Sequence, residues 1–228
     1  MDASGSTLTA AAQAIRALYR PTDVAGTLAA IVEVARLSLD DVDHVSVSLA
    51  GRDGSLETVA ATDDLVRDLD RLQHDLGEGP CLHAALDAET VVIHHARHEQ
   101  RWPAYMAVAV RRGVRAQVGL RLHVDDRVLG ALNLYSLAAD RIGDESLQLA
   151  ELLAAAAATA LGGVREREHL RTALESRERI GMAVGVVMER FGLDAERAFD
   201  YLARTSQHGN RKLRDVAEAL LAPPSEAR

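Results

Sequence analysis

Apolar residues recur every three or four positions in some stretches of the chain and alternate with polar residues in others. The three- and four-residue spacing of 7–19 and 22–37 predicts two helices separated by Pro21. His44–Ala50 alternates apolar and polar residues, which predicts a strand with one face buried. Residues 56–62 predict a second strand that returns after the turn GRDGS. The chain therefore begins with helices and continues with a hairpin.

The middle of the chain mixes helical and extended patterns. The stretch DDLVRDLDRLQHDL predicts a helix, and GEGPC ends it because glycine and proline are costly inside a helix. A short helix, a strand at TVVIHH and a helix near 103–112 follow. RAQVGLRLHV and VLGALNLYS, joined by DDR, form the clearest hairpin of the sequence. Strands paired by hairpins, with helices before and after, predict an α+β domain on an antiparallel sheet.

The pattern turns helical at Asp144 and stays so. A long helix of about 144–190 contains Gly162 and Gly163, which favour a kink or hinge. An apolar stripe runs along it through Leu149, Leu153, Ala156, Ala160, Leu170 and Leu174. This stripe either packs on the sheet of its own chain or pairs two copies as a parallel coiled coil, and the second alternative is favoured over 165–178.

Two further helices follow and complete a small unit of three helices. Gly192 ends the long helix, and Asp194 caps the next one, whose inward face is predicted to hold Ala198, Phe199 and Leu202. Asn210 is predicted to cap the last helix. We therefore expect two domains, an α+β domain over 1–160 and an all-α domain over 161–228.

The charge of the chain differs between its two parts. The net charge is −8, but residues 166–228 hold 11 basic and 11 acidic side chains, so the whole excess lies in 1–165. This balance argues against a nonspecific nucleic-acid coat. The first residues lack the pattern of a signal peptide, and the most apolar run, LLAAAAATAL, is about half the ~20 residues of a membrane span. A cytoplasmic protein is expected, with no membrane partner.

Few residues form a pattern typical of catalysis or metal binding. Cys81 is the single cysteine, which excludes an internal disulfide framework. It follows Gly-Glu-Gly-Pro at a helix start, so it is either a redox or ligand site with a lowered pKa or a small inert core residue. His94, His95 and His98 cluster beside Glu99, but without standard metal-site spacing, and a surface loop is favoured. We predict no catalytic residue, no metal and no cofactor.

The tail resembles the ANTAR domain, an RNA-binding module of bacterial antitermination regulators. LESRERIGMAVGVVMERFG, AERAFDYLARTS and NRKLRDVAEALL follow the pattern of that family in order over about 170–221. The resemblance implies binding to paired stem-loops of nascent transcripts, which lets polymerase pass a terminator. The RNA-binding residues that we carry over or expect are Arg177, Arg179, Ala183, Gly185, Ser206, Asn210, Arg211, Lys212 and Arg214. Val184 stands where family members often have a lysine, which removes one basic contact.

The physical chemistry of the last helix agrees with that implication. Arg211, Lys212 and Arg214 gather at its start, where backbone amides favour anions. Basic side chains on phosphates commonly accompany recognition of unpaired loop bases. Without the resemblance, a solvated charged face explains the three residues equally well.

The first part resembles the GAF sensor domains that precede ANTAR domains in actinobacterial-type regulators. LGEGPCLHAAL, RWPAYMAVAVRRGVRA and VLGALNLYS are the segments that match, within about 10–160. The resemblance implies a pocket for a small molecule or signal against the sheet and names no ligand. The Asn-Lys-Phe-Asp-Glu pattern of cyclic-nucleotide-binding members is not found.

The resulting hypothesis is a homodimeric sensor–effector regulator in which the GAF domain controls RNA binding by the ANTAR domain. A change of helix register or dimer packing across 144–180 would carry the signal. A DNA-binding or protein-interacting regulator that uses the C-terminal helices is the alternative, because the last two helices resemble a helix-turn-helix. A GAF-like reductase of free methionine sulfoxide works by a cysteine relay, which one cysteine cannot supply.

Overall fold

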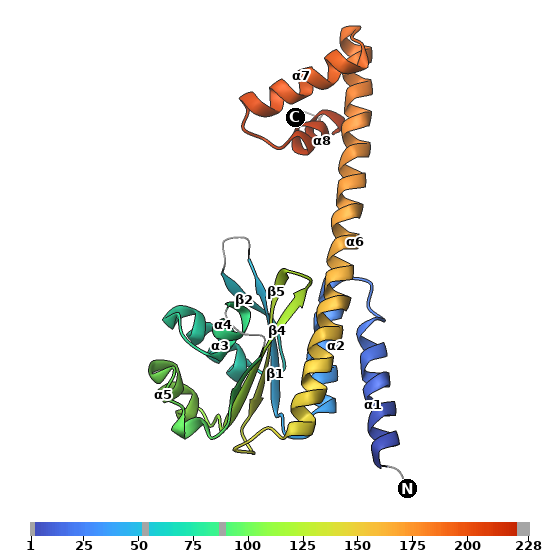
Figure 1. Ribbon diagram of the computed structural model, residues 1–228. Helices are drawn as coiled ribbons and strands as arrows, with labels where there is room; N and C mark the ends of the chain where they lie inside the picture. Colours follow the sequence, from blue (N-terminus) through green and yellow to red (C-terminus); the bar gives the residue numbers. More distant parts are fainter. Residues whose placement is uncertain (1–2, 52–54, 87–89, 223–228) are drawn as a thin grey trace, which may run out of the picture. The chain divides into compact units, whose positions relative to one another are not determined.

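The computed structural model describes residues 3–51, 55–86 and 90–222. These residues form two compact units, Met1–Arg165 and Glu166–Arg228 (Figure 1). The first unit is built on a sheet and the second consists of helices, so the predicted α+β fold class is confirmed. The predicted turn GRDGS lies partly outside the described residues.

The first unit contains a five-stranded sheet with the strand order β2-β1-β5-β4-β3. All four neighbouring pairs are antiparallel. The strands are β1 (His44–Ala50), β2 (Leu56–Ala61), β3 (Thr90–Ile93), β4 (Ala116–Val124) and β5 (Arg127–Ser136). The hairpin predicted for β4 and β5 is confirmed, and β1 lies in the sheet interior between β2 and β5.

Helices cover both faces of this sheet (Figure 1). On one side lie α1 (Ala3–Leu18), α2 (Val24–Ser38) and the first part of α6 (Asp144–Phe191), whose residues share one core with the sheet. On the other side lie α3 (Asp64–Leu76), α4 (Pro80–Leu86), the 3-10 turn η1 (Ala96–His98) and α5 (Pro103–Arg111). The prediction that one face of β1 is exposed is wrong, because Ser46 and Ser48 are buried. The helices on this second side of the sheet cover that face.

Local signals in the sequence fix the ends of several helices. The Asp23 carboxylate accepts a hydrogen bond from the amide of Gly26 and so caps α2. Asp63 caps α3 in the same way, and Gly77 ends α3 in the left-handed conformation with φ 65°. The predicted breaker GEGPC therefore separates α3 from α4.

The long helix α6 runs without interruption through Gly162 and Gly163. A kink or hinge at this pair stays a prediction. A Cβ atom on Gly162 would lie 3.2 Å from Cγ2 of Val124, so this glycine lets α6 approach the β4–β5 hairpin closely. Leu153 and Ala160 are buried in the same core. The first half of the apolar stripe therefore packs on its own sheet.

By length and composition alone, α6 could also cross a membrane. Its apolar residues Leu153, Ala157 and Leu161 are buried in the core of the first unit. Packing within the unit thus accounts for the apolar character of this part of α6.

The second unit contains the rest of α6, α7 (Ala195–His208) and α8 (Leu213–Leu221). Its buried core consists of Ala183, Val187, Ala198, Leu202, Val216 and Ala217. Asp194 caps α7 as predicted. Two expectations are wrong: the side chain of Phe199 is 44% exposed, and the cap of α8 is Lys212 rather than Asn210.

Candidate functional site

The turn between α7 and α8 holds several of the predicted RNA-binding residues. The Ser206 hydroxyl donates a hydrogen bond to the carbonyl of Arg211 at 2.6 Å, and Nη2 of Arg211 donates to the carbonyl of Asp215 at 3.2 Å. Asn210 adopts a left-handed backbone with φ 46°, which asparagine tolerates well. These contacts hold the turn in one shape, with Asn210, Arg211 and Lys212 exposed.

Two other predicted basic residues form ion pairs. Nε of Arg214 lies 3.2 Å from Oδ1 of its neighbour Asp215. Arg179 of α6 pairs with Glu218 of α8 and so ties the two helices together. All four side chains are about half exposed, and such surface pairs exchange readily for other anions because they contribute little to stability. Both arginines can therefore turn to a phosphate.

The remaining predicted residues lie on α6, and they do not share one face. Ala183 is fully buried in the core of the second unit. It has no surface for RNA, so a contact through its side chain is ruled out in this structure. Gly185 points away from the core, where nothing lies within 4 Å of a Cβ placed on it. Arg177 is exposed on α6, two turns before Gly185.

A shallow hollow of about 590 Å³ surrounds Gly185. Met182, Val186, Glu189 and Arg190 line the rest of it. Because Gly185 has no side chain, another molecule can approach the backbone of α6 closely at this point. Val184, which replaces the lysine of the family pattern, packs against the core instead.

The first unit encloses a group of polar side chains between the sheet and α3. Asp70 of α3 is the centre of this group. Oδ2 of Asp70 accepts a hydrogen bond from Thr58 at 3.0 Å, and Oδ1 accepts bonds from Asn133 at 3.2 Å and from Tyr135. We call Ser46, Ser48, Thr58, Asp70, Gln73, Asn133 and Tyr135 the buried polar cluster.

Burial dominates the electrostatics of this cluster. It raises the pKa of Asp70 from 3.8 to about 6, although hydrogen bonds from Ser46, Tyr135 and Thr58 act in the opposite direction. Burial also raises the pKa of Tyr135 well above its ordinary value, and the nearby charge of Asp70 adds to this effect. Burial therefore favours the protonated form of Asp70.

Cys81 lies beside this cluster, and of the two interpretations left open for it the structure supports the small core residue. The thiol is fully buried, and burial together with the charge of Asp70 raises its pKa to about 12. Its backbone amide donates a hydrogen bond to Oε1 of Gln73 at 2.8 Å. Cys81 is therefore a small, protonated core residue that helps to join α4 to α3.

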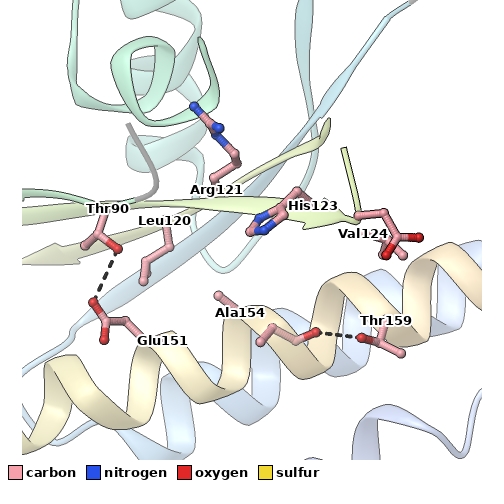
Figure 2. A pocket seen from close by; sticks show the side chains of 10 residues that line it. Thr90, Leu120, Arg121, His123, Val124, Glu151, Ala154 and Thr159 are labelled. Carbon is pink, nitrogen blue, oxygen red and sulfur yellow. Dashed lines mark hydrogen bonds between the residues drawn. The ribbon is translucent and has the colours of Figure 1, made fainter. Parts of the chain in front are cut away.

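A second feature of the first unit is a hollow of about 480 Å³ beside α6. Figure 2 shows it between the end of β4 and α6, with Glu151 of α6 reaching toward Thr90 of β3. The Thr90 hydroxyl donates to Oε1 of Glu151 at 3.3 Å. Leu120, Val124 and Ala154 supply apolar lining, and His123 lies at the rim. Both polar and apolar side chains line the hollow, and α6 forms one of its walls.

The histidine cluster follows β3. His95 has a left-handed backbone with φ 51°, and its ring centroid lies 6.2 Å from that of His98. Within the part of the chain that the structure describes, no group of three His, Cys, Asp or Glu side chains is placed to hold a metal ion.

Family models match both units of the chain. The GAF domain model matches residues 23–161 and the ANTAR domain model matches residues 168–221. The chain belongs to the GAF family and carries an ANTAR domain after it. It is a GAF–ANTAR protein. GAF domains are sensory modules, ANTAR domains are RNA-binding modules of antitermination regulators, and this architecture is typical of regulators.

No curated protein matches the GAF–ANTAR chain, but many solved structures share its fold. The Stigmatella aurantiaca phytochrome photosensory core module has a TM-score of 0.61 at 15% identity, over 85% of this chain and 43% of that one. The GAF domain of Acinetobacter phosphoenolpyruvate-protein phosphotransferase has a TM-score of 0.56 at 13% identity, over 72% and 98%.

A third similar structure is free methionine-R-sulfoxide reductase from Neisseria meningitidis in complex with its substrate. Its TM-score is 0.54 at 16% identity, over 71% of this chain and 91% of that one. At these identities the likeness shows the fold alone. The chain spans less than half of the phytochrome module, so the activity of that protein does not transfer.

Sequence patterns did not predict the buried polar cluster. Ser46 and Ser48 alternate with apolar residues along β1, which is also the pattern of a strand with one face in water. The available signal was the i, i+3 spacing of Asp70 and Gln73 on α3. Asp70 and Gln73 form hydrogen bonds with residues of β5 that are 62 to 65 positions away in the sequence, which no local pattern can show.

Proposed function

We propose that this GAF–ANTAR protein is an antitermination regulator whose tail binds paired stem-loops in nascent transcripts. The observation that carries the proposal is the exposed α7–α8 turn within the matched ANTAR region. Ser206 fixes the turn, and Asn210, Arg211 and Lys212 point into solvent. A fixed loop with two exposed cationic side chains suits the phosphates around an unpaired RNA loop.

The alternative of duplex DNA binding is less well supported. A recognition helix enters the major groove and presents several polar side chains along one face. α8 has nine residues, of which Val216 and Ala217 are buried and Leu213 and Leu220 are partly buried. Only a short polar face of α8 therefore remains to contact base edges.

We further propose that two copies of the chain pair through α6. Leu170 and Leu174 are 56% and 68% exposed, so this part of the apolar stripe is not covered by its own chain. In a parallel coiled coil these residues take core positions, and Glu166 of one copy faces Arg171 of the other. Pairing supplies two RNA-binding turns, which suits two adjacent stem-loops because the second contact is intramolecular.

The GAF unit would then control this pair. A small molecule that occupies the hollow beside β4 touches α6 directly through Glu151 and Ala154. Because α6 continues into the ANTAR unit, a shift of α6 or of its packing against a second copy alters how the two turns are presented.

The class of nucleic acid is tested with the full chain. A pool of two-stem-loop RNAs with randomised loops is partitioned on the protein, and binding of the enriched RNA is measured by fluorescence anisotropy at one fixed salt concentration. We expect binding that is lost when the loops are scrambled and that duplex DNA does not compete away. No enrichment, or equal binding of the scrambled RNA, contradicts the proposal.

A further inference from the structure

The ANTAR unit places all of its aromatic side chains at its surface. Phe191, Phe199 and Tyr201 are 51%, 44% and 42% exposed, and the buried core of the unit is purely aliphatic. The GAF unit, in contrast, buries three of its four aromatic side chains: Trp102, Tyr105 and Tyr135 are at most 8% exposed. Large rings are among the most favourable residues to bury, so their common exposure here points to a ligand with flat, apolar faces.

Two of these rings meet. The centroids of Phe191 and Tyr201 lie 5.3 Å apart, with their planes inclined by 41°. Phe191 is the last residue of α6, and Tyr201 lies in the middle of α7. The chain reverses between them at Gly192, whose φ of 64° is left-handed. The two helices therefore present one joint aromatic surface.

Tyr201 belongs to a regular stripe along α7. Arg197, Tyr201, Arg204 and His208 follow one another at spacings of four, three and four residues, which places them on one face of the helix. All four are exposed. Phe199 and Ser206 lie on the opposite flank of the buried residues Ala198 and Leu202. The stripe is thus separate from the side of α7 that leads to the α7–α8 turn.

The cations of this stripe remain available to a ligand. Arg204 is exposed, and its Nε donates to the backbone carbonyl of Asp200 at 3.3 Å, which is a neutral acceptor. Nε of Arg197 lies 3.6 Å from Oδ2 of Asp194 in an exposed pair, which exchanges easily. Aromatic rings and guanidinium groups therefore alternate along this face of α7. Such a surface suits single-stranded RNA, because bases can stack on the rings while phosphates contact the guanidinium groups.

We propose that Phe191 and the α7 stripe form a second RNA contact, where an unpaired nucleotide stacks on Phe191 and Tyr201 while Arg197 and Arg204 hold its phosphates. This inference rests on the proposed RNA binding of the tail. It assigns the stripe to a nucleotide other than those held by the α7–α8 turn, because the two surfaces flank α7 on opposite sides. Stacking tolerates any base, so the contact adds affinity rather than sequence choice.

The test measures the dissociation constant of full-length variants with the RNA enriched from the randomised pool. Tyr201→Leu keeps an apolar side chain and removes the ring, so we expect binding at least about fivefold weaker. Tyr201→Phe keeps the ring and should bind within about twofold of the unchanged chain. Tyr19→Leu is the matched control, since Tyr19 is an exposed tyrosine of the GAF unit. Arg204→Gln should lower the salt dependence by about one phosphate contact.

The outcomes separate this inference from the proposed function. If the unchanged chain binds no RNA, the proposed function fails and this inference fails with it. If the unchanged chain binds and Tyr201→Leu binds equally well with an unaltered circular dichroism melt, only this inference is overturned. A change of oligomeric state in Tyr201→Leu, measured by light scattering, would overturn it too, because the stripe would then contact protein.

Discussion

Tyr135 on β5 donates a hydrogen bond to the carboxylate of Asp70 on α3, and both residues are fully buried. The bond connects the centre of the sheet to the helical layer that carries α3, α4 and α5. It has a consequence for stability, because burial raises the pKa of Asp70 from 3.8 to about 6. The folded chain therefore binds a proton at Asp70 more tightly than the unfolded chain does.

The first prediction is that the contribution of Asp70 to the free energy of unfolding of the GAF unit falls as the pH rises. A raised pKa means that the contribution of the protonated group is full below pH 3.8 and is lost as the pH passes through about 6. The stability of the unchanged chain relative to Asp70→Asn should fall by about 2 kcal/mol between about pH 4 and pH 7.5. Urea unfolding followed by the fluorescence of Trp102, the single tryptophan, measures it. A difference that stays constant with pH would contradict it.

The second prediction concerns Cys81. Because its thiol is fully buried and its pKa is raised to about 12, it should not react with a thiol reagent in the native chain at neutral pH. One thiol per chain should react after addition of denaturant. Labelling with an aromatic disulfide reagent, followed by absorbance, checks this. Rapid native labelling would restore the redox hypothesis.

The third prediction separates stability from binding at Gly185. Nothing lies within 4 Å of a Cβ on Gly185 or on Gly181, and both are inside α6. Gly185→Ala and Gly181→Ala should each stabilise the ANTAR unit by up to about 1 kcal/mol, because alanine favours a helix. If RNA approaches the backbone at Gly185, only Gly185→Ala weakens RNA binding. Thermal melts and anisotropy measure the two effects, and equal RNA affinities would remove Gly185 from the site.

The fourth prediction tests pairing of two copies through α6. Leu174→Asp places a charge in the proposed coiled-coil core and should shift the protein from dimer to monomer. Thr172→Asp introduces the same charge on another face of the same turn and should leave the dimer intact. Sedimentation equilibrium of both variants gives their masses. Equal masses for Leu174→Asp and the unchanged chain would refute pairing at this stripe.

Residue spacing predicted most of the fold. The β4–β5 hairpin, the end of α3 at Gly77 and the cap at Asp194 all depend on a few neighbouring residues, and the structure confirms them. The buried polar cluster depends on contacts between α3, β1 and β5, and no local pattern distinguishes a serine in such a cluster from one in water. The close approach of α6 to Val124 at Gly162 is likewise a long-range contact, which no local pattern shows.

The predicted RNA-binding residues illustrate the same limit. A family pattern marks positions without saying which side chains are exposed. Ala183 matches the pattern and is buried, whereas Phe199 has the spacing of a core residue and is 44% exposed. Both α7 flanks carry exposed aromatic residues because the small three-helix core is filled by alanine, valine and leucine.

The central claim is that the α7–α8 turn holds RNA, and the dissociation constant of the Arg211→Ala, Lys212→Ala double variant tests it most directly. Its matched control is Arg36→Ala, which removes one exposed arginine of α2 that pairs with Glu33. On the enriched two-stem-loop RNA we predict weaker binding of the double variant, with a salt dependence reduced by about two phosphate contacts, and unchanged binding of the control. Equal dissociation constants for the double variant and the unchanged chain would contradict the account.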